Sequence, residues 1–195
     1  QIEAGYRAFD QQRQLDHAQS IGHGCMLPRW TAESDQGPLA LIASGTLGDT
    51  LLLSRYGPWL QQRLQAEVEL YVQPPLLNLL QHSLGHSVAV KSFSELHRQH
   101  KGTALSLISL PGLFGSSQEH HALAYPHLQA APHLIEHWRG RLELAPDETL
   151  IGLNWHGSAL QALSERHSSD IPLNTFERLS RLPGVRLVSL QKGIG

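Results

Sequence analysis

The chain has 195 residues, of which 41% are apolar and only 16% are charged. This composition suffices for a packed core and excludes an intrinsically disordered chain. The net charge of −2 argues against a nucleic-acid-binding surface. The single cysteine, Cys25, excludes an internal disulfide and a cysteine zinc site. No apolar run approaches the length of a membrane span, and no signal-peptide pattern occurs. The first residue is Gln1 rather than Met, so we expect a piece of a longer protein. The single cysteine and the absence of a signal-peptide pattern lead us to expect a reducing, cytoplasmic compartment.

The 13 histidines are numerous for a chain of this size. His82 and His86, like His133 and His137, are spaced to share a helix face, and residues 120–121 are an adjacent pair. Metal ligation needs three or four converging ligands, and no His-Glu-x-x-His pattern appears. We therefore expect solvated surface histidines and no metal site.

The chain begins with a segment of its own, residues 1–38. Ala4–Leu15 has the pattern of a short amphipathic helix. Ser20–Pro38 is a loop by composition, rich in glycine, proline and polar residues. Within it, Trp30 is expected to pack as an anchor rather than to stack on a ligand. We expect this segment to join the chain to an upstream region.

The rest of the chain is organised around one stretch. Leu39–Ala43 is an apolar run that predicts a buried strand, and a small polar turn follows at Ser44–Asp49. A helical pattern comes next, with Leu52, Tyr56 and Leu60 at four-residue spacing. Strand, glycine turn and helix form the first unit of a parallel α/β sheet.

The polar turn is a candidate ligand site, because ligands bind beyond the carboxyl ends of parallel strands. Gly45 and Gly48 would let the backbone come close to a ligand. Asp49 has two interpretations: it caps the helix, or its carboxylate acts as a general base. The Gly-x-x-Gly spacing is not the dinucleotide fingerprint, and a Walker lysine is absent.

Three further strands continue the first lobe, with short helices between them. The patterns predict strands at Val68–Val72, Ser87–Phe93 and Ala104–Leu110, the last closed by Pro111 and Gly112. The order predicts an α/β fold with one Rossmann-like parallel sheet. The loop at Leu113–Gln129 is expected to face a ligand.

A second α/β unit follows a helix at Pro132–Leu142 and a polar linker at Glu143–Glu148. The predicted elements are strands at Leu150–Trp155 and Val185–Leu190 and a helix at Thr175–Leu182. We expect the strand at Leu150 to lie in a separate sheet. Two strands and one helix cannot close a core, so this half either docks on the first sheet or lacks its remainder.

Four groups of short motifs follow one another along the chain. They are Ala4–Arg13 with Pro28–Trp30; Gly45–Thr50 with Arg55–Tyr56; Val72–Leu76 with Ser109–Pro111 and Phe114–Gly115; and Gly152–Gly157 with Ile171–Leu173 and Pro183–Gly193. In this order they resemble the glycosyltransferase region found behind tetratricopeptide repeats in bacterial proteins, a relative of the heptosyltransferases and O-linked GlcNAc transferases. The family patterns are "GLGDT…RY" and "GLVWSG…SIPL…PGVRFVSLQKG".

The resemblance implies a GT-B fold, in which two Rossmann-like lobes flank the active site. It implies metal-independent transfer of a sugar from a nucleotide-sugar donor, which is a substrate rather than a cofactor, to a hydroxyl of a glycan or protein acceptor. Residues 39–145 would be the acceptor-side lobe, and residues 146–195 the start of a truncated donor-side lobe. Tetratricopeptide repeats would stand upstream. Asp49 would be the general base.

The resemblance also supplies candidate binding residues. They are Gly45, Thr46, Gly48 and Thr50 in the first turn, and Asn154, His156, Gly157, Ser158, Arg166 and Lys192 for the donor. Arg166 and Lys192 suit a leaving diphosphate, which needs fixed positive charge; the alternative is solvated surface charge.

The chain departs from the family before Ile171. Residues 164–170 have one arginine position fewer than the family's Asn-Asp-Arg-x-Arg-Ser run. This departure favours a non-catalytic Rossmann-like module that binds a glycan or protein partner. A scaffold that keeps the fold only for packing is the third alternative.

Overall fold

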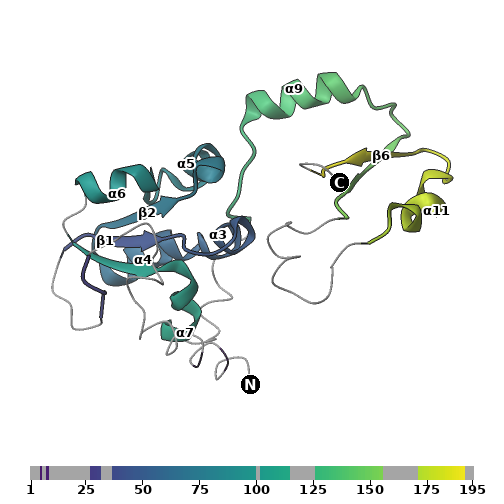
Figure 1. Cartoon of the computed structure of the whole chain (residues 1–195). Helices are drawn as coiled ribbons and strands as arrows, with labels where there is room; N and C mark the ends of the chain where they lie inside the picture. Colours follow the sequence, from purple (N-terminus) through teal and green to yellow (C-terminus); the bar gives the residue numbers. More distant parts are fainter. Residues whose placement is uncertain are drawn as a thin grey trace. The chain divides into compact units, whose positions relative to one another are not determined.

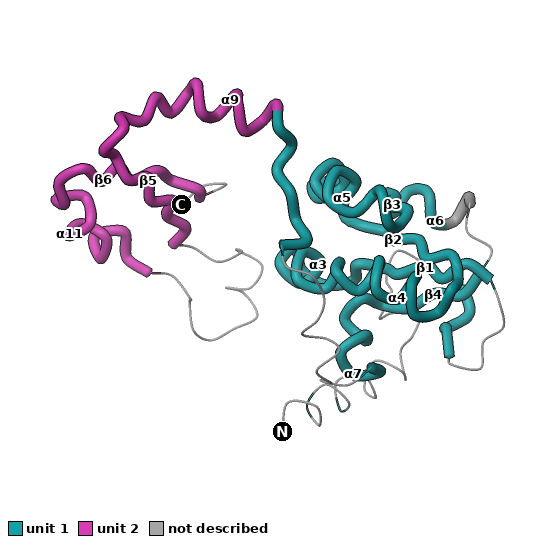
Figure 2. Tube along the Cα trace, turned by 180° about the vertical axis from the view of Figure 1, so that it is seen from behind, with its two compact units in different colours: residues 1–132 teal, residues 133–195 magenta. Residues whose placement is uncertain are grey.

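The structure is a computed structural model that describes residues 5, 8, 27–31, 37–99 (backbone only at 97–99), 102–114, 126–155 and 171–191. The chain divides into two compact units, residues 1–132 and 133–195 (Figure 2). Gly5 and Ala8 are helical, and most of the helix predicted at 4–15 lies outside the described residues. Among the described helices, none has the length and apolar character to cross a bilayer.

The first unit contains a four-stranded sheet in the order β3-β2-β1-β4, with β1 and β2 labelled in Figure 1 and all four strands in Figure 2. Its strands are β1 (Leu39–Ile42), β2 (Val68–Val72), β3 (Ala89–Ser92) and β4 (Thr103–Ser106). All pairings are parallel. The prediction of one parallel sheet from these four segments is confirmed. The strand order reverses at β1, between its neighbours β2 and β4, so a topological switch point lies at the β1–β4 boundary.

Helices cover both faces of this sheet. They are α3 (Leu47–Leu53), α4 (Tyr56–Leu64), α5 (Leu77–Leu84), α6 (Phe93–Gln99) and α7 (Leu110–Phe114), with 3-10 turns at Pro74–Leu76 and Leu107–Ser109. Buried side chains of α3, α4 and α5 form the larger hydrophobic cluster with Leu39, Leu41 and Leu70. The smaller cluster, on the other face, contains Ile42 and Leu96 of α6.

The helix predicted after the glycine turn is broken in two. The break lies at Ser54–Arg55, where the Ser54 hydroxyl donates to the Leu51 carbonyl at 3.1 Å. A continuous helix would place Pro58 in its interior, where proline lacks the N–H and its ring clashes. The break instead puts Pro58 in the first turn of α4, where proline is tolerated. Leu52 is 53% exposed, whereas Tyr56 and Leu60 are buried. The prediction that these three residues share one face of a single helix is therefore wrong.

The predicted strand at Ala104–Leu110 is also too long. β4 ends at Ser106, a 3-10 turn follows, and Pro111 lies inside α7 rather than closing a strand. A continuous apolar run does not distinguish a strand from a buried helical turn. Leu107 and Leu110, three residues apart, are both buried in the larger cluster, which a helical turn achieves and a strand does not.

Trp30 packs as an anchor, as predicted. Its backbone N–H donates to the Ala104 carbonyl at 2.9 Å, and Ala104 donates to the Pro28 carbonyl at 2.8 Å. The Trp30 ring lies 6.2 Å from the Phe114 ring and packs against the larger cluster. Residues 28–30 therefore extend the sheet at β4.

A charged network is buried on the smaller face of the sheet. The Tyr71 hydroxyl donates to Glu69 Oε2 at 2.7 Å, and Lys91 Nζ forms an ion pair with Glu69 Oε1. Burial, together with this bond to the Glu69 carboxylate, raises the pKa of Tyr71 above its usual range. Glu69 is 7% exposed, and these two donors are among the groups that compensate the burial of its carboxylate.

We expect Lys91→Met to destabilise the first unit by about 2 kcal/mol, since it leaves a buried carboxylate with one donor fewer. The expected loss is below that of a fully buried pair because water reaches Lys91. Urea unfolding measures it. The double variant Glu69→Gln/Lys91→Met should recover part of the loss, because the Tyr71 hydroxyl can still donate to the side-chain carbonyl of the new glutamine. A single-variant loss under about 0.5 kcal/mol would show that solvent screens the pair.

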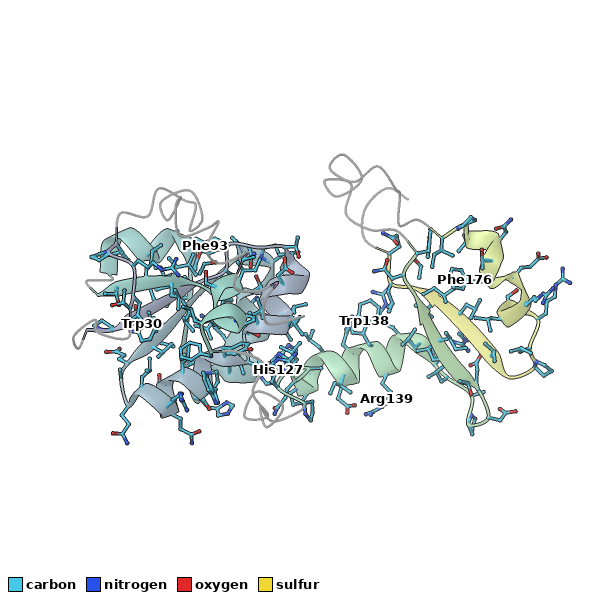
Figure 3. The ribbon with its side chains drawn as sticks, turned by 90° about the horizontal axis from the view of Figure 1, so that it is seen from below. Trp30, Phe93, His127, Trp138, Arg139 and Phe176 are labelled. Atoms are coloured by element: carbon cyan, nitrogen blue, oxygen red, sulfur yellow. The ribbon has the colours of Figure 1, made fainter. Side chains whose placement is uncertain are left out.

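The second unit contains α9 (Pro132–Leu142) and a separate parallel pair, β5 (Thr149–Leu153) with β6 (Val185–Ser189). The prediction that the strand at Leu150 stands outside the first sheet is confirmed. The helix predicted at Thr175–Leu182 is instead a 3-10 turn (Leu173–Phe176) followed by one turn of α11 (Glu177–Ser180). Trp138 and Arg139 leave α9 on opposite sides, and Trp138 is 54% exposed (Figure 3).

Arg186 of β6 ties α9 to the second sheet. Its guanidinium donates to the Leu142 carbonyl at the end of α9 and, at 3.4 Å, to the Glu143 carbonyl. Its Nε donates to Glu148 Oε1 at 2.7 Å, and this bond lowers the pKa of Glu148. A cation at a helix C-terminus is also favoured by the helix dipole. These bonds, called the Arg186 clasp below, join the end of α9 to β6 within the second unit.

The stability that Glu148 contributes should be lost in acid. A carboxyl whose pKa is lowered by folding stabilises above its unfolded pKa, here near 4.5, and loses that contribution as pH falls further. We expect the amides of β5 and β6 to lose hydrogen-exchange protection below about pH 4.5, after correction for intrinsic rates. In Arg186→Met, protection should be lower and insensitive to acid.

Arg181→Met is the matched control, because Arg181 pairs with Glu177 on the exposed surface of α11. Such pairs contribute little. Equal losses in the two variants would contradict a specific role for the Arg186 clasp.

Candidate functional site

The candidate site lies at the switch point, where β1 and β4 end. Ser44 follows β1, Ser106 ends β4, and their hydroxyl oxygens are hydrogen-bonded to each other. Gly45 and Thr46 then lead into α3. Ligands of open α/β sheets bind in the crevice beyond these carboxyl ends. The predicted turn therefore stands at the one place in this sheet where the topology favours a ligand.

Thr46 and Asp49 form a capping box at the start of α3. Asp49 Oδ2 accepts from the Thr46 backbone N–H and from the Thr46 hydroxyl, both at 2.8 Å, and Thr46 Oγ1 accepts from the Asp49 N–H at 3.2 Å. The N-cap residue is thus Thr46, and the prediction of Asp49 as N-cap is wrong by three positions. Asp49 is the reciprocal partner within the helix.

The two carboxylate oxygens of Asp49 differ in their surroundings. Oδ2 is committed to Thr46, whereas no donor among the described residues contacts Oδ1. The residue is partly exposed. One oxygen therefore fixes the carboxylate in place, and the other remains able to accept a proton from a ligand.

The structure requires glycine at one of the two glycine positions of the turn and not at the other. A Cβ at Gly45 would lie 2.7 Å from Asp49 Oδ2 and 2.9 Å from Asp49 Cβ, so Gly45 makes room for the capping box. A Cβ at Gly48 would meet nothing closer than Thr46 Oγ1 at 3.7 Å. No contact among the described residues requires glycine at position 48, although glycine weakens a helix.

Gln73, which follows β2, supports the turn from inside. Its amide donates to the Gly45 carbonyl at 3.0 Å and lies 3.4 Å from the Ala43 carbonyl. Its Oε1 accepts from the Thr50 hydroxyl at 3.0 Å. Thr50 is 1% exposed, and its hydroxyl also bonds the Thr46 carbonyl. This hydroxyl therefore makes its hydrogen bonds inside the protein.

Sequence reasoning did not single out Gln73 or Ser106 for the site. The available signal was position: each stands at the carboxyl end of a predicted or observed strand, and parallel strands end at one edge. Once β2 and β4 are known to be the neighbours of β1, this signal predicts that Gln73 and Ser106 lie beside the turn that follows β1.

The predicted donor residues belong to the second unit. Asn154 is exposed and follows β5, and the neighbouring Trp155 N–H donates to Gln191 Oε1 at 3.3 Å. The other predicted donor residues, His156, Gly157, Ser158, Arg166 and Lys192, lie outside the described residues. Their roles, and the predicted groove between the two turns, stay predictions.

Among the described residues, no group of three or more His, Cys, Asp or Glu side chains is placed to hold a metal. No protein-family model, curated protein or solved structure matches the chain.

The two glycines should respond oppositely to alanine. Gly48→Ala should raise stability by about 0.4–1 kcal/mol, because α3 gains a better helix former without a clash. Gly45→Ala should lower the melting temperature, since its Cβ displaces Asp49. Melting temperature measures both, and a destabilised Gly48→Ala would contradict the assignment. Weaker binding of a nucleotide sugar or acceptor by the more stable Gly48→Ala variant would indicate close approach of a ligand at Gly48.

Proposed function

We propose that the chain is the acceptor-side lobe and the beginning of the donor-side lobe of a metal-independent GT-B glycosyltransferase. It transfers a sugar from a nucleotide-sugar donor to a hydroxyl of a glycan or protein acceptor. The observation that supports this most is Asp49. It stands at the switch point of the sheet, with Oδ2 held by Thr46 and Oδ1 contacted by no donor among the described residues.

In the proposed reaction, Asp49 Oδ1 takes the proton of the acceptor hydroxyl. The acceptor oxygen bonds to the anomeric carbon of the donor sugar, and the bond from that carbon to the diphosphate oxygen breaks. The nucleoside diphosphate leaves with the electron pair. Positioned proton acceptance of this kind contributes about 100- to 10,000-fold. The capping box supports the proposal because a held carboxylate loses little freedom on reaction.

The donor side of the proposal rests on sequence alone. The second unit supplies Asn154 beyond the end of β5, together with the predicted contacts at positions 156–158, 166 and 192. Arg166 and Lys192 would stabilise the charge that develops on the leaving diphosphate.

Asp49→Asn should retain the fold and lose transfer. Asparagine keeps a side-chain oxygen for the Thr46 N–H, so we expect a stability loss of no more than about 1 kcal/mol. It cannot take up the proton, so transfer should fall by about 100-fold or more. Asp49→Ala should lose both stability and transfer. The measurements are melting temperature and release of free nucleoside diphosphate from a panel of nucleotide sugars, in the native full-length chain that carries these residues.

Glu95→Gln is a matched control. Glu95 Oε1 accepts from the Ser92 N–H at 2.9 Å, the same type of capping contact at the start of α6. It should affect stability as Asp49→Asn does and leave transfer unchanged. Transfer by Asp49→Asn at close to the parental rate would show that Asp49 only caps α3.

A non-catalytic binding module is the second candidate. It is favoured by the extent to which the polar groups of the turn already bond one another, through Thr46, Thr50 and Gln73. Such a module would bind a glycan or protein partner and release no nucleotide. Acceptor binding that survives in Asp49→Asn, without nucleotide release by the parent protein, would favour this candidate.

A further inference from the structure

A cavity of about 570 Å³ in the first unit is lined by none of the predicted site residues. It lies between α4, the end of α5 with the turn that follows it, and the segment at residues 126–129, called the strap below. Small-molecule pockets occupy about 300–1,000 Å³, so the cavity is large enough for a ligand.

The strap is fixed at two points. The ring of His127 donates from Nε2 to the Leu51 carbonyl at 2.8 Å, because a carbonyl oxygen can only accept. The backbone N–H of Gln129 donates to Ser83 Oγ at 2.9 Å, and this hydroxyl donates to the Gln129 carbonyl at 3.3 Å. Ser83 is only 2% exposed. His127, labelled in Figure 3, is thus a wall residue held by hydrogen bonds.

The titratable side chains among the described lining residues are all basic. Arg55, His86 and His127 contribute basic groups, and no Asp or Glu is among the described residues that line the cavity. Gln61, Gln62 and Gln129 add polar groups. Among the described lining residues, Arg55 is the one permanently charged side chain, in a chain whose net charge is −2 when the histidines are neutral. A concave surface of one sign concentrates ions of the other.

The end of α5 does not oppose this charge strongly. A helix C-terminus carries partial negative charge on its free carbonyls. Here the Leu84 carbonyl accepts from the N–H groups of Ser87 and Val88, at 2.8 and 3.0 Å, and the Gln81 carbonyl accepts from Gly85 at 3.0 Å. These carbonyls already have donors, so the basic side chains set the sign of the cavity.

The cavity also has a firm aromatic wall. The Trp59 ring meets the rings of Tyr56 and Phe114 edge-on, at centroid distances of 5.9 and 5.2 Å. Pro58, Leu84 and Pro126 complete the apolar part of the lining. Rigid aromatic and proline surfaces suit a flat apolar group, with a few polar groups to orient it.

We propose that this cavity binds a small organic anion, a carboxylate or phosphate ester that carries a flat apolar group. Arg55 and His86 contact the anionic group, His127 forms part of the wall, and Trp59 contacts the flat group. The proposal does not depend on the transfer reaction, because the cavity shares no residue with the Ser44–Asp49 turn.

The test is a titration of the native full-length chain at constant ionic strength, followed by tryptophan fluorescence and by NMR. The probes are phenyl phosphate, benzoate and the neutral benzyl alcohol. We expect phenyl phosphate or benzoate to bind with a dissociation constant on the order of 1 mM, and benzyl alcohol to bind at least about tenfold more weakly. The stronger of the two anions identifies the preferred anionic group.

Gln62→Glu places a carboxylate in the lining at an exposed position of α4, so the fold should be unaffected. It should weaken anion binding at least about tenfold and leave benzyl alcohol unchanged. Asn78→Asp makes the same charge change on α5, outside the lining, and should bind like the parent. If Gln62→Glu melts differently from the parent, His86→Glu, on the exposed turn after α5, replaces it.

Three results would overturn the proposal. They are no anion binding at tens of millimolar probe, equal affinity for benzyl alcohol and phenyl phosphate, or parental anion affinity in the Glu variant.

Discussion

The first unit depends on the parallel pairing of β1 with both of its neighbours. Leu39, Ala40, Leu41 and Ile42 are buried on both faces and register with β2 on one side and β4 on the other. All four side chains of β1 are apolar, as is usual for a central parallel strand. The first polar side chains after β1 stand beyond its end, at Ser44, Thr46 and Asp49. The candidate site therefore stands where the buried strand β1 ends, at the switch point of the sheet.

The capping box ties stability and chemistry to one carboxylate. Asp49 Oδ2 satisfies donors that the start of α3 would otherwise leave without partners, and Gly45 is needed so that the carboxylate fits. A residue used in this way would occur at this position even in a protein without catalytic activity. The distinction between a cap and a base therefore rests on Oδ1, which contributes nothing to the cap. Asparagine separates the two roles because it preserves one oxygen and removes the proton acceptor.

The sequence allowed the strand segments and their division into two sheets to be predicted, because buried runs and a polar linker are local features. It did not allow the break before α4 to be predicted, since the apolar spacing of Leu52, Tyr56 and Leu60 suggested one helix. The position of Pro58 was the contrary signal. Within the candidate site, Gly45, Thr46 and Asp49 were predictable from a turn after a strand. Gln73 was not, because its role depends on which strands are neighbours and on an amide that reaches back across the turn.

Different interactions stabilise each of the two units internally. The first has a continuous hydrophobic cluster that joins its sheet to α3, α4 and α5. In the second, none of the described residues is buried, and the strands β5 and β6 are at most half-buried. Parallel pairs are ordinarily covered on both faces, whereas the described residues of this unit form no buried cluster over β5 and β6. Arg186 partly replaces a core by joining β6, the end of α9 and Glu148 through hydrogen bonds. Regions with few buried apolar contacts open most readily.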